Sequence, residues 1–122
     1  VVYRRAKHII TENARTLTAS EALKSGDIAT VSEAMAQSHV SMRDDFEITV
    51  PPIDFLVKII DEVLGKSGGV RMTGGGFGGC VVALAPTDKV DAVKQVVEQK
   101  YFDETGYTAD IYVCTATQGA FA

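Results

Sequence analysis

The sequence contains no tryptophan, only three prolines and two cysteines among its 122 residues. No apolar run reaches the roughly 18 residues that a membrane-spanning helix needs. The net charge of −4 with 46% apolar residues excludes a disordered chain, and an acidic chain lacks the basic surface that binds nucleic acid. These absences predict a folded protein of one domain that binds neither nucleic acid nor membrane.

The cysteines and the first residues predict where the protein works. Cys80 and Cys114 stand in apolar runs without the Cys-x-x-Cys spacing of metal or redox sites, so we expect buried, reduced thiols in a cytoplasmic protein. The chain starts at Val1 without an initiator methionine or the zones of a signal peptide. We therefore expect it to be part of a longer protein.

The first half of the chain has helical periodicity. Residues 1–25 carry apolar side chains at spacings of three and four, typical of an amphipathic helix that Gly26 ends. Asp27 can cap a second helix that ends near Arg43. Pro51-Pro52 opens a third helix that Gly65 ends. The apolar stripes of the three helices comprise Val2, Ala6, Ile9 or Ile10 and Leu17; Ile28, Val31, Met35 and Met42; and Ile53, Leu56, Val57, Ile60, Val63 and Leu64.

The second half alternates strands with one helix. Residues 70–72 and 80–85 predict two strands, the second of them buried, on either side of a glycine loop. Thr87 can cap a fourth helix, and residues 107–113 alternate like a last strand that returns parallel to 80–85. The predicted fold class is α+β, helical over 1–64 and strand, loop, strand, helix, strand over 70–114, with helices on one side of a small sheet.

Eight of the eleven glycines fall within residues 65–79. Glycine provides no side chain to pack, so this loop predicts a close approach to the backbone, and successive free N–H groups favour phosphate. The P-loop pattern fails because Ile60 stands where its first glycine belongs. Gly74, Gly76 and Gly79 match the dinucleotide and protein-kinase glycine patterns, but no helix follows directly and the other kinase motifs are missing.

The longer string Gly-Val-Arg-Met-Thr-Gly-Gly-Gly-Phe-Gly-Gly-Cys at 69–80 is far more specific. It closely resembles the third motif of the GHMP small-molecule kinases, in the form that sugar kinases of that family use. Residues 38–51 and the helix from Arg5 to Arg15, with His8, Glu12 and Asn13, are similar to the segments that precede this motif. The resemblance covers essentially the whole chain.

The resemblance implies that 1–122 is the C-terminal domain of such a kinase, a ferredoxin-like, mostly antiparallel sheet covered by helices. It implies ATP and a sugar as substrates, with Mg²⁺, all bound mainly by an N-terminal part that would be this domain's partner. The catalytic Asp and Arg belong to that part, so no catalytic or metal residue is expected here and the chain alone should be inactive. The residues implied near the transferred phosphate are Gly74, Gly75, Gly76, Phe77, Gly78 and Gly79, with Thr73 beside them.

Several side chains have two interpretations each. Phe77 packs at a domain interface or touches substrate, and Thr73 caps its own turn or donates to a phosphate. Arg71 pairs with a carboxylate such as Asp45 or adds positive charge near the site. Asp44-Asp45 can act as a base or Mg²⁺ ligand, although capping or ion pairing is simpler. The isolated His8 and His39 are expected on a helix surface or in the core.

Two other functions stay open. The chain can belong to another GHMP sugar or isoprenoid kinase, or it can be a non-catalytic binding module of ferredoxin-like type that holds a partner or a small regulator. In either case strand edges left uncovered can lead to self-association.

Overall fold

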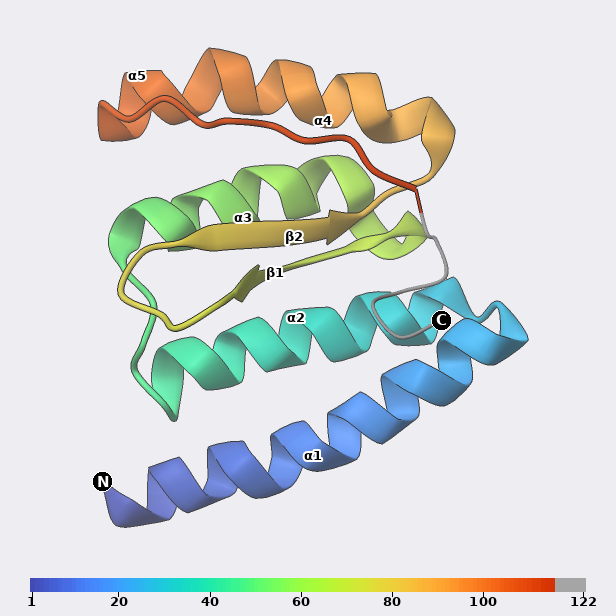
Figure 1. Ribbon diagram of the computed structural model, residues 1–122, viewed down its shortest axis with the longest axis vertical. Coiled ribbons are helices and arrows are strands. Elements are labelled where there is room, and N and C mark those ends of the chain that lie inside the picture. The colour runs from blue at the N-terminus through green and yellow to red at the C-terminus, as the bar shows by residue number, and fades with distance from the viewer. Residues whose placement is uncertain (116–122) are drawn as a thin grey trace.

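The structure, a computed structural model, describes residues 1–115 (Figure 1). Five α-helices, three short helical turns and two strands follow one another in this part of the chain. They are α1 (Val2–Ser25), α2 (Ile28–Asp44), α3 (Pro51–Leu64), η1 (Gly65–Ser67), β1 (Gly69–Thr73), β2 (Cys80–Leu84), η2 (Thr87–Lys89), α4 (Val90–Val96), η3 (Val97–Tyr101) and α5 (Phe102–Thr105). The α+β class and the three-helix first half are confirmed.

The helix ends follow the expected local chemistry. Gly26 adopts a left-handed conformation with a φ of 75° after α1, and the Asp27 carboxylate accepts the backbone N–H of Thr30 at the start of α2. Pro51 and Pro52 form the first turn of α3, which ends at Leu64 before Gly65. The cap expected from Thr87 is wrong. A 3₁₀ turn closed by the Lys89 N–H and the Pro86 carbonyl precedes α4, whose start has no side-chain cap.

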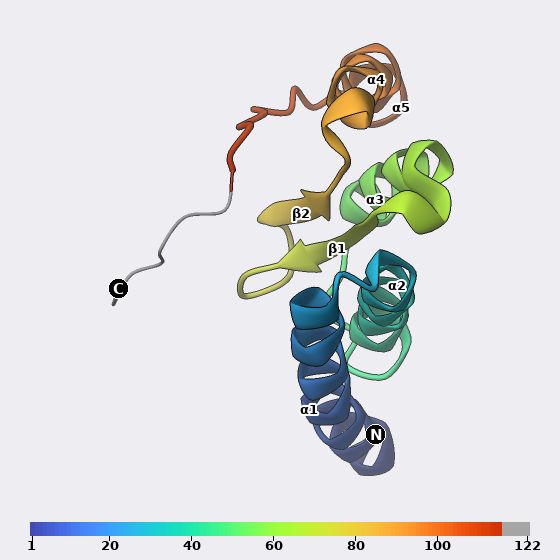
Figure 2. The same ribbon diagram turned by 90° about the vertical axis from the view of Figure 1, so that its right-hand side faces the viewer.

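The sheet consists of β1 and β2, paired antiparallel from Gly69 opposite Leu84 to Thr73 opposite Cys80. Helices α2 and α3 lie on one side of it, and the opposite side is open (Figure 2). The larger core cluster lies between α3, β1 and the α4–η3 region, and a smaller one joins the end of α2 to β1. The two clusters comprise Val57, Ile59, Ile60, Leu64, Val70, Val97 and Tyr101, and Met42, Ile53 and Met72.

The prediction of a last strand at 107–113 is wrong: these residues form no strand in the structure. A cavity of about 730 Å³ with a largely apolar lining separates them from β2 and α3. Alternation of apolar residues gives a segment one apolar face, but it does not supply the neighbouring backbone that a strand needs.

Strand β2 is not buried as expected, since only Val81 packs against the core clusters and the other four residues are exposed. Cys80 and Cys114 are both free and exposed, which corrects the prediction of buried thiols. An apolar composition does not by itself bury a segment, and within residues 1–115 no further strand or helix covers the outer face of β2.

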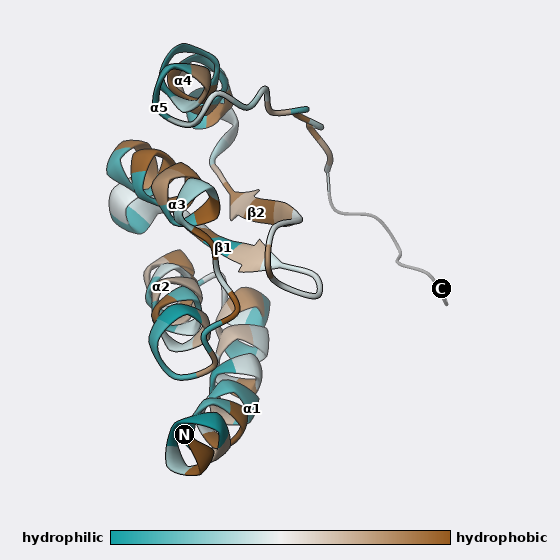
Figure 3. Cartoon of the chain, turned by 90° about the vertical axis from the view of Figure 1, so that its left-hand side faces the viewer, coloured by the Kyte–Doolittle hydropathy of each residue, from teal (hydrophilic) through white to brown (hydrophobic). Residues whose placement is uncertain are grey.

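Helix α1 packs by a different face from the one its apolar stripe indicates. Val2, Ile10 and Leu17 are 83%, 69% and 70% exposed. The face against α2 instead carries the buried His8 and Ala22 and the half-buried Glu12 and Arg15. Hydrophobic residues are visible along α1, including its first turns (Figure 3).

Candidate functional site

The glycine loop, residues 74–79, connects the paired ends of β1 and β2. Its backbone is largely left-handed: φ is 96° at Gly74, 89° at Gly76, 59° at Phe77, 130° at Gly78 and 90° at Gly79. Residues other than glycine rarely adopt these angles, and a bulky residue such as Phe77 adopts them only when its surroundings enforce it.

Ile48 enforces the shape of the loop. The Phe77 backbone N–H donates to the Ile48 carbonyl over 2.6 Å. A Cβ on Gly76 would lie 2.7 Å from the Ile48 Cβ and 2.9 Å from its carbonyl oxygen, so only glycine fits there. The Ile48 N–H in turn donates to the Met42 carbonyl at 3.0 Å, which ties the loop to the end of α2.

The rest of the loop is open to solvent. A Cβ added at Gly74, Gly75 or Gly78 would meet nothing within 4 Å, and Phe77 is 72% exposed. Successive backbone N–H groups in such a turn form a concave site for an anion. The Phe77 side chain therefore does not pack within the described part of the chain, and either of its two interpretations remains a prediction.

His39 links α2 to β1 and α3. Its ring is buried; Nδ1 accepts the Met72 backbone N–H at 3.2 Å, and Nε2 lies 2.8 Å from an Asp54 carboxylate oxygen. The other oxygen of Asp54 accepts the Thr49 hydroxyl at 3.1 Å. This network is adjacent to Thr73, where β1 enters the glycine loop. It confirms His39 as a core histidine with satisfied partners.

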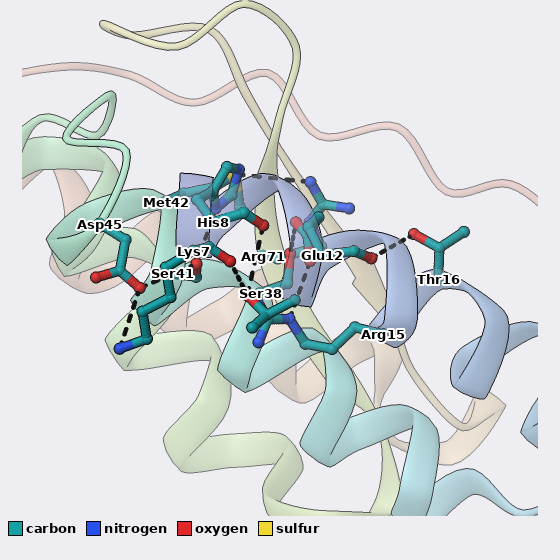
Figure 4. A network of polar contacts seen from close by, with 11 residues as sticks. Lys7, His8, Glu12, Arg15, Thr16, Ser38, Ser41, Met42, Asp45 and Arg71 are labelled. Atoms are coloured by element: carbon teal, nitrogen blue, oxygen red, sulfur yellow. Dashed lines mark hydrogen bonds and ion pairs between the residues drawn. The ribbon is translucent and has the colours of Figure 1, made fainter. Parts of the chain in front are cut away.

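A polar cluster occupies the seam between α1, α2 and β1 (Figure 4). Glu12 accepts the Ser38 hydroxyl and, at 3.0 Å, the Arg15 Nε. Burial raises the pKa of Glu12, but the hydrogen bonds from Ser38 and Arg15 and the charges of Arg15 and Arg71 outweigh burial, so its pKa lies below the usual value. The Glu12 carboxylate is therefore ionised within this seam.

Arg71 contacts this cluster and not Asp45. Its guanidinium donates to the Met42 sulfur over 3.6 Å, and its Nε is buried without a partner among the described residues. The ion pair expected with Asp45 is not formed in residues 1–115, because the Arg71 side chain extends toward Glu12 from the middle of β1. The influence of Arg71 on the loop stays a prediction.

Asp44 and Asp45 are engaged in pairing at the end of α2. Asp44 binds the Arg43 guanidinium at 2.8 Å, which lowers the pKa of Asp44, and Asp45 lies 3.7 Å from the Lys7 ammonium. These contacts confirm the ion-pairing interpretation of the acidic pair. Within residues 1–115, no three His, Cys, Asp or Glu side chains lie close enough to hold a metal ion.

His8 is also buried, which corrects the helix-surface alternative. Its Nδ1 lies 2.8 Å from the Ser41 hydroxyl, and its ring stacks on Phe46 with centroids 4.6 Å apart. Sequence reasoning missed Ile48, Thr49 and Asp54. Asp54 has a visible signal, an acid in the first turn of a helix, but the ordinary interpretation as a partner of the helix dipole conceals its bond to His39.

The described helices include none that is both long and apolar enough to cross a membrane. The chain thus combines a two-stranded antiparallel sheet, helices on one side of it and a left-handed glycine loop between its strands. The family model described as "GHMP kinases C terminal" matches residues 19–104, and the chain belongs to this family.

The individual relatives are galactokinases. The chain is 59% identical over 118 residues to galactokinase of Pasteurella multocida and 60% identical over 116 residues to that of Actinobacillus succinogenes. These matches cover 97% and 95% of this chain but 31% and 30% of the relatives, so the chain spans about a third of their length. The crystal structure of Lactococcus lactis galactokinase complexed with galactose superposes with a TM-score of 0.82 at 39% identity, over 89% of this chain and 28% of that one.

Proposed function

We propose that this chain is the C-terminal part of a galactokinase, which transfers the γ-phosphoryl group of ATP to the anomeric hydroxyl of galactose. The observation that carries the proposal is the 59% identity to a galactokinase over 97% of the chain. A relationship to another GHMP sugar or isoprenoid kinase would predict a different set of relatives.

The glycine loop is the part of this chain that we assign to catalysis. Phosphoryl transfer needs positioning and stabilisation of negative charge more than side-chain chemistry. The open backbone at Gly74, Gly75 and Gly78 fits a phosphate oxygen, because no side chain blocks its approach. The Thr73 hydroxyl, at the end of β1, can add a hydrogen bond. In this role the loop binds and orients the group being transferred.

The remaining groups belong, in our proposal, to the rest of the parent enzyme. Following the resemblance to the GHMP kinases, we assign Mg²⁺, most of the ATP site, the galactose site and the catalytic acid–base residues to the N-terminal part, within the share of the relatives that this chain does not cover. We also propose a cytoplasmic location, in keeping with the free thiols of Cys80 and Cys114.

The exposed stripe of α1 supports a large internal partner. Val2, Tyr3, Ile10 and Leu17 are each at least 69% exposed and share one side of the helix. Large apolar side chains exposed along one side of a helix indicate an interface. The relatives extend well beyond the part that this chain matches. We propose that the N-terminal part of the parent enzyme covers this stripe.

The test is reconstitution. The 122-residue chain with galactose and ATP should release no ADP in a coupled assay, whereas the chain mixed or co-expressed with the N-terminal part should phosphorylate galactose. Mevalonate and homoserine serve as control substrates for other members of the family. Turnover by the chain alone, or a reconstituted enzyme that prefers a control substrate, would contradict the proposal.

A further inference from the structure

The chemistry of the Met72 amide fixes the state of His39. A backbone N–H can only donate, so the Nδ1 atom that it meets at 3.2 Å must carry a lone pair. The ring proton of the neutral imidazole is then on Nε2, from which it donates to Asp54 over 2.8 Å. Asp54 and the Met72 amide thus select one tautomer and one ring orientation.

Met72 is bonded by His39 at the edge of β1 away from β2. In an antiparallel pair, alternate residues direct their N–H and C=O groups outward. The Met72 N–H is one of these outward groups, and Met72 is fully buried, so water cannot bond it. At Met72, the residue before the last one of β1, the His39 ring therefore accepts the hydrogen bond that a neighbouring strand would otherwise accept.

Residues 48–54, which include the Asp54 partner of His39, also hold the apex of the loop. The Phe77 N–H donates to the Ile48 carbonyl, and Ile48 precedes Thr49, whose hydroxyl donates to Asp54. A hydrogen-bonded path thus runs from Met72 through His39 and Asp54 to Thr49, and the residue before Thr49 binds Phe77. Both the entry and the apex of the glycine loop are anchored to residues 48–54.

We propose that His39 is a positioning residue for the glycine loop. Its neutral Nε2–H tautomer holds the Met72 amide and so sets the direction in which the chain leaves β1 toward Gly74–Gly79. The loop's action on a transferred phosphate rests on the proposed function. The anchoring itself does not, and the two are tested separately.

Two substitutions separate the two bonds of His39. Asparagine places an amide oxygen where Nδ1 stands, so His39→Asn keeps an acceptor for the Met72 N–H and loses the reach to Asp54. Glutamine places its amide nitrogen near Nε2, so His39→Gln keeps the donor to Asp54 and loses the acceptor. The matched controls are the same substitutions at His8, which is also buried but bonds Ser41.

The anchoring is measured by NMR on the chain itself. The His39 ring should show a protonated Nε2 and an unprotonated Nδ1, with a scalar coupling across the hydrogen bond between the Met72 and Nδ1 nitrogens. His39→Gln should shift the amide signals of Gly74–Gly79, whereas His39→Asn and the His8 variants should leave them near their wild-type positions. The opposite tautomer in the wild-type chain would overturn the proposal, and this outcome needs no variant to fold.

The consequence is measured in the full-length enzyme that contains this chain. His39→Gln should lower kcat for phosphorylation about 10- to 100-fold through loop misplacement, with the KM for galactose unchanged and with activity largely retained in His39→Asn. If both variants lost activity equally, and in proportion to their loss of folded protein, His39 would have a structural role only. If the wild-type enzyme does not act on galactose, the proposed function fails while the NMR result still decides the anchoring.

Discussion

Gly76 is the residue on which the loop's shape depends most. Its φ is 89°, and a Cβ added there would lie 2.7 to 2.9 Å from Ile48 atoms, which leaves no room for a side chain. Gly75, its neighbour, has neither constraint. The two positions therefore form a matched pair within one loop.

We predict that Gly76→Ala lowers kcat of the full-length enzyme at least about tenfold and destabilises the chain by about 1–3 kcal/mol, through strain in the left-handed region. Gly75→Ala should leave the free energy of unfolding nearly unchanged, because a Cβ added there meets no atom within 4 Å. Urea unfolding compares the stabilities of the two variants, and steady-state kinetics measures kcat of Gly76→Ala. Equal losses of stability in the two variants would contradict the role assigned to Ile48.

Glu12 provides a prediction on pH. Its pKa in the folded chain lies below the usual value of about 4.5, so the folded state favours the ionised carboxylate. This contribution to stability is complete above about pH 4.5 and is lost as pH falls through the lower folded pKa. Glu12→Gln should remove that part of the acid dependence of the unfolding free energy, measured by urea unfolding between about pH 3 and 7. An unchanged acid slope would contradict the assignment.

At the scale of elements, α1 is the clearest case in which sequence and structure differ. Its apolar periodicity correctly predicts a helix, since periodicity reports backbone geometry. It does not report which face packs inside this chain. The inner face is polar and is held by Glu12, Ser38 and Arg15, and the apolar face is left for another surface.

We expect Ile10→Ser with Leu17→Ser to change the unfolding free energy of the chain by less than about 0.5 kcal/mol, because both side chains are largely exposed. The same pair should weaken association with the N-terminal part of the parent, measured by calorimetric titration. Leu64→Ala is the control: Leu64 is 1% exposed, so its truncation should cost about 2–5 kcal/mol. A large loss of stability in the double variant would show that this stripe is part of the chain's own core.

Much of the fold is predictable from the sequence because its signals are local. Gly26 and Asp27, the Pro51-Pro52 start and the change from period 3.6 to period 2 after Gly65 each specify a boundary within a few residues. The strand expected at 107–113 fails because a strand depends on a distant partner. Composition alone reveals the glycine loop but not its anchors at Ile48 and Asp54, since ordinary residues acquire that role only through the fold.

For the whole molecule, the edge of β2, unpaired in the described part of the chain, has a measurable effect. Val82 is 46% exposed on β2, which has no further strand beside it in residues 1–115. Such an edge favours pairing with a second copy. We propose that the isolated chain self-associates through it as concentration rises.

A charge on this strand should suppress that association. We predict that Val82→Lys shifts the sedimentation profile of the isolated chain toward monomer. Val40→Lys is the control, because Val40 is 45% exposed but lies on α2. Identical sedimentation profiles for the two variants would exclude the edge of β2 as the contact between copies.

Because the backbone of the loop is left-handed, a chemically synthesised chain could carry a D-amino acid in it. A D-amino acid prefers the positive φ that Gly78 adopts at 130°. The junction Gly79–Cys80 directly after it is suited to joining two synthetic peptides at a cysteine. Replacing Gly78 by D-alanine would restrict the unfolded chain without opposing the folded angle, and so convert a permissive turn into a rigid one by mirror-image chemistry that no codon specifies.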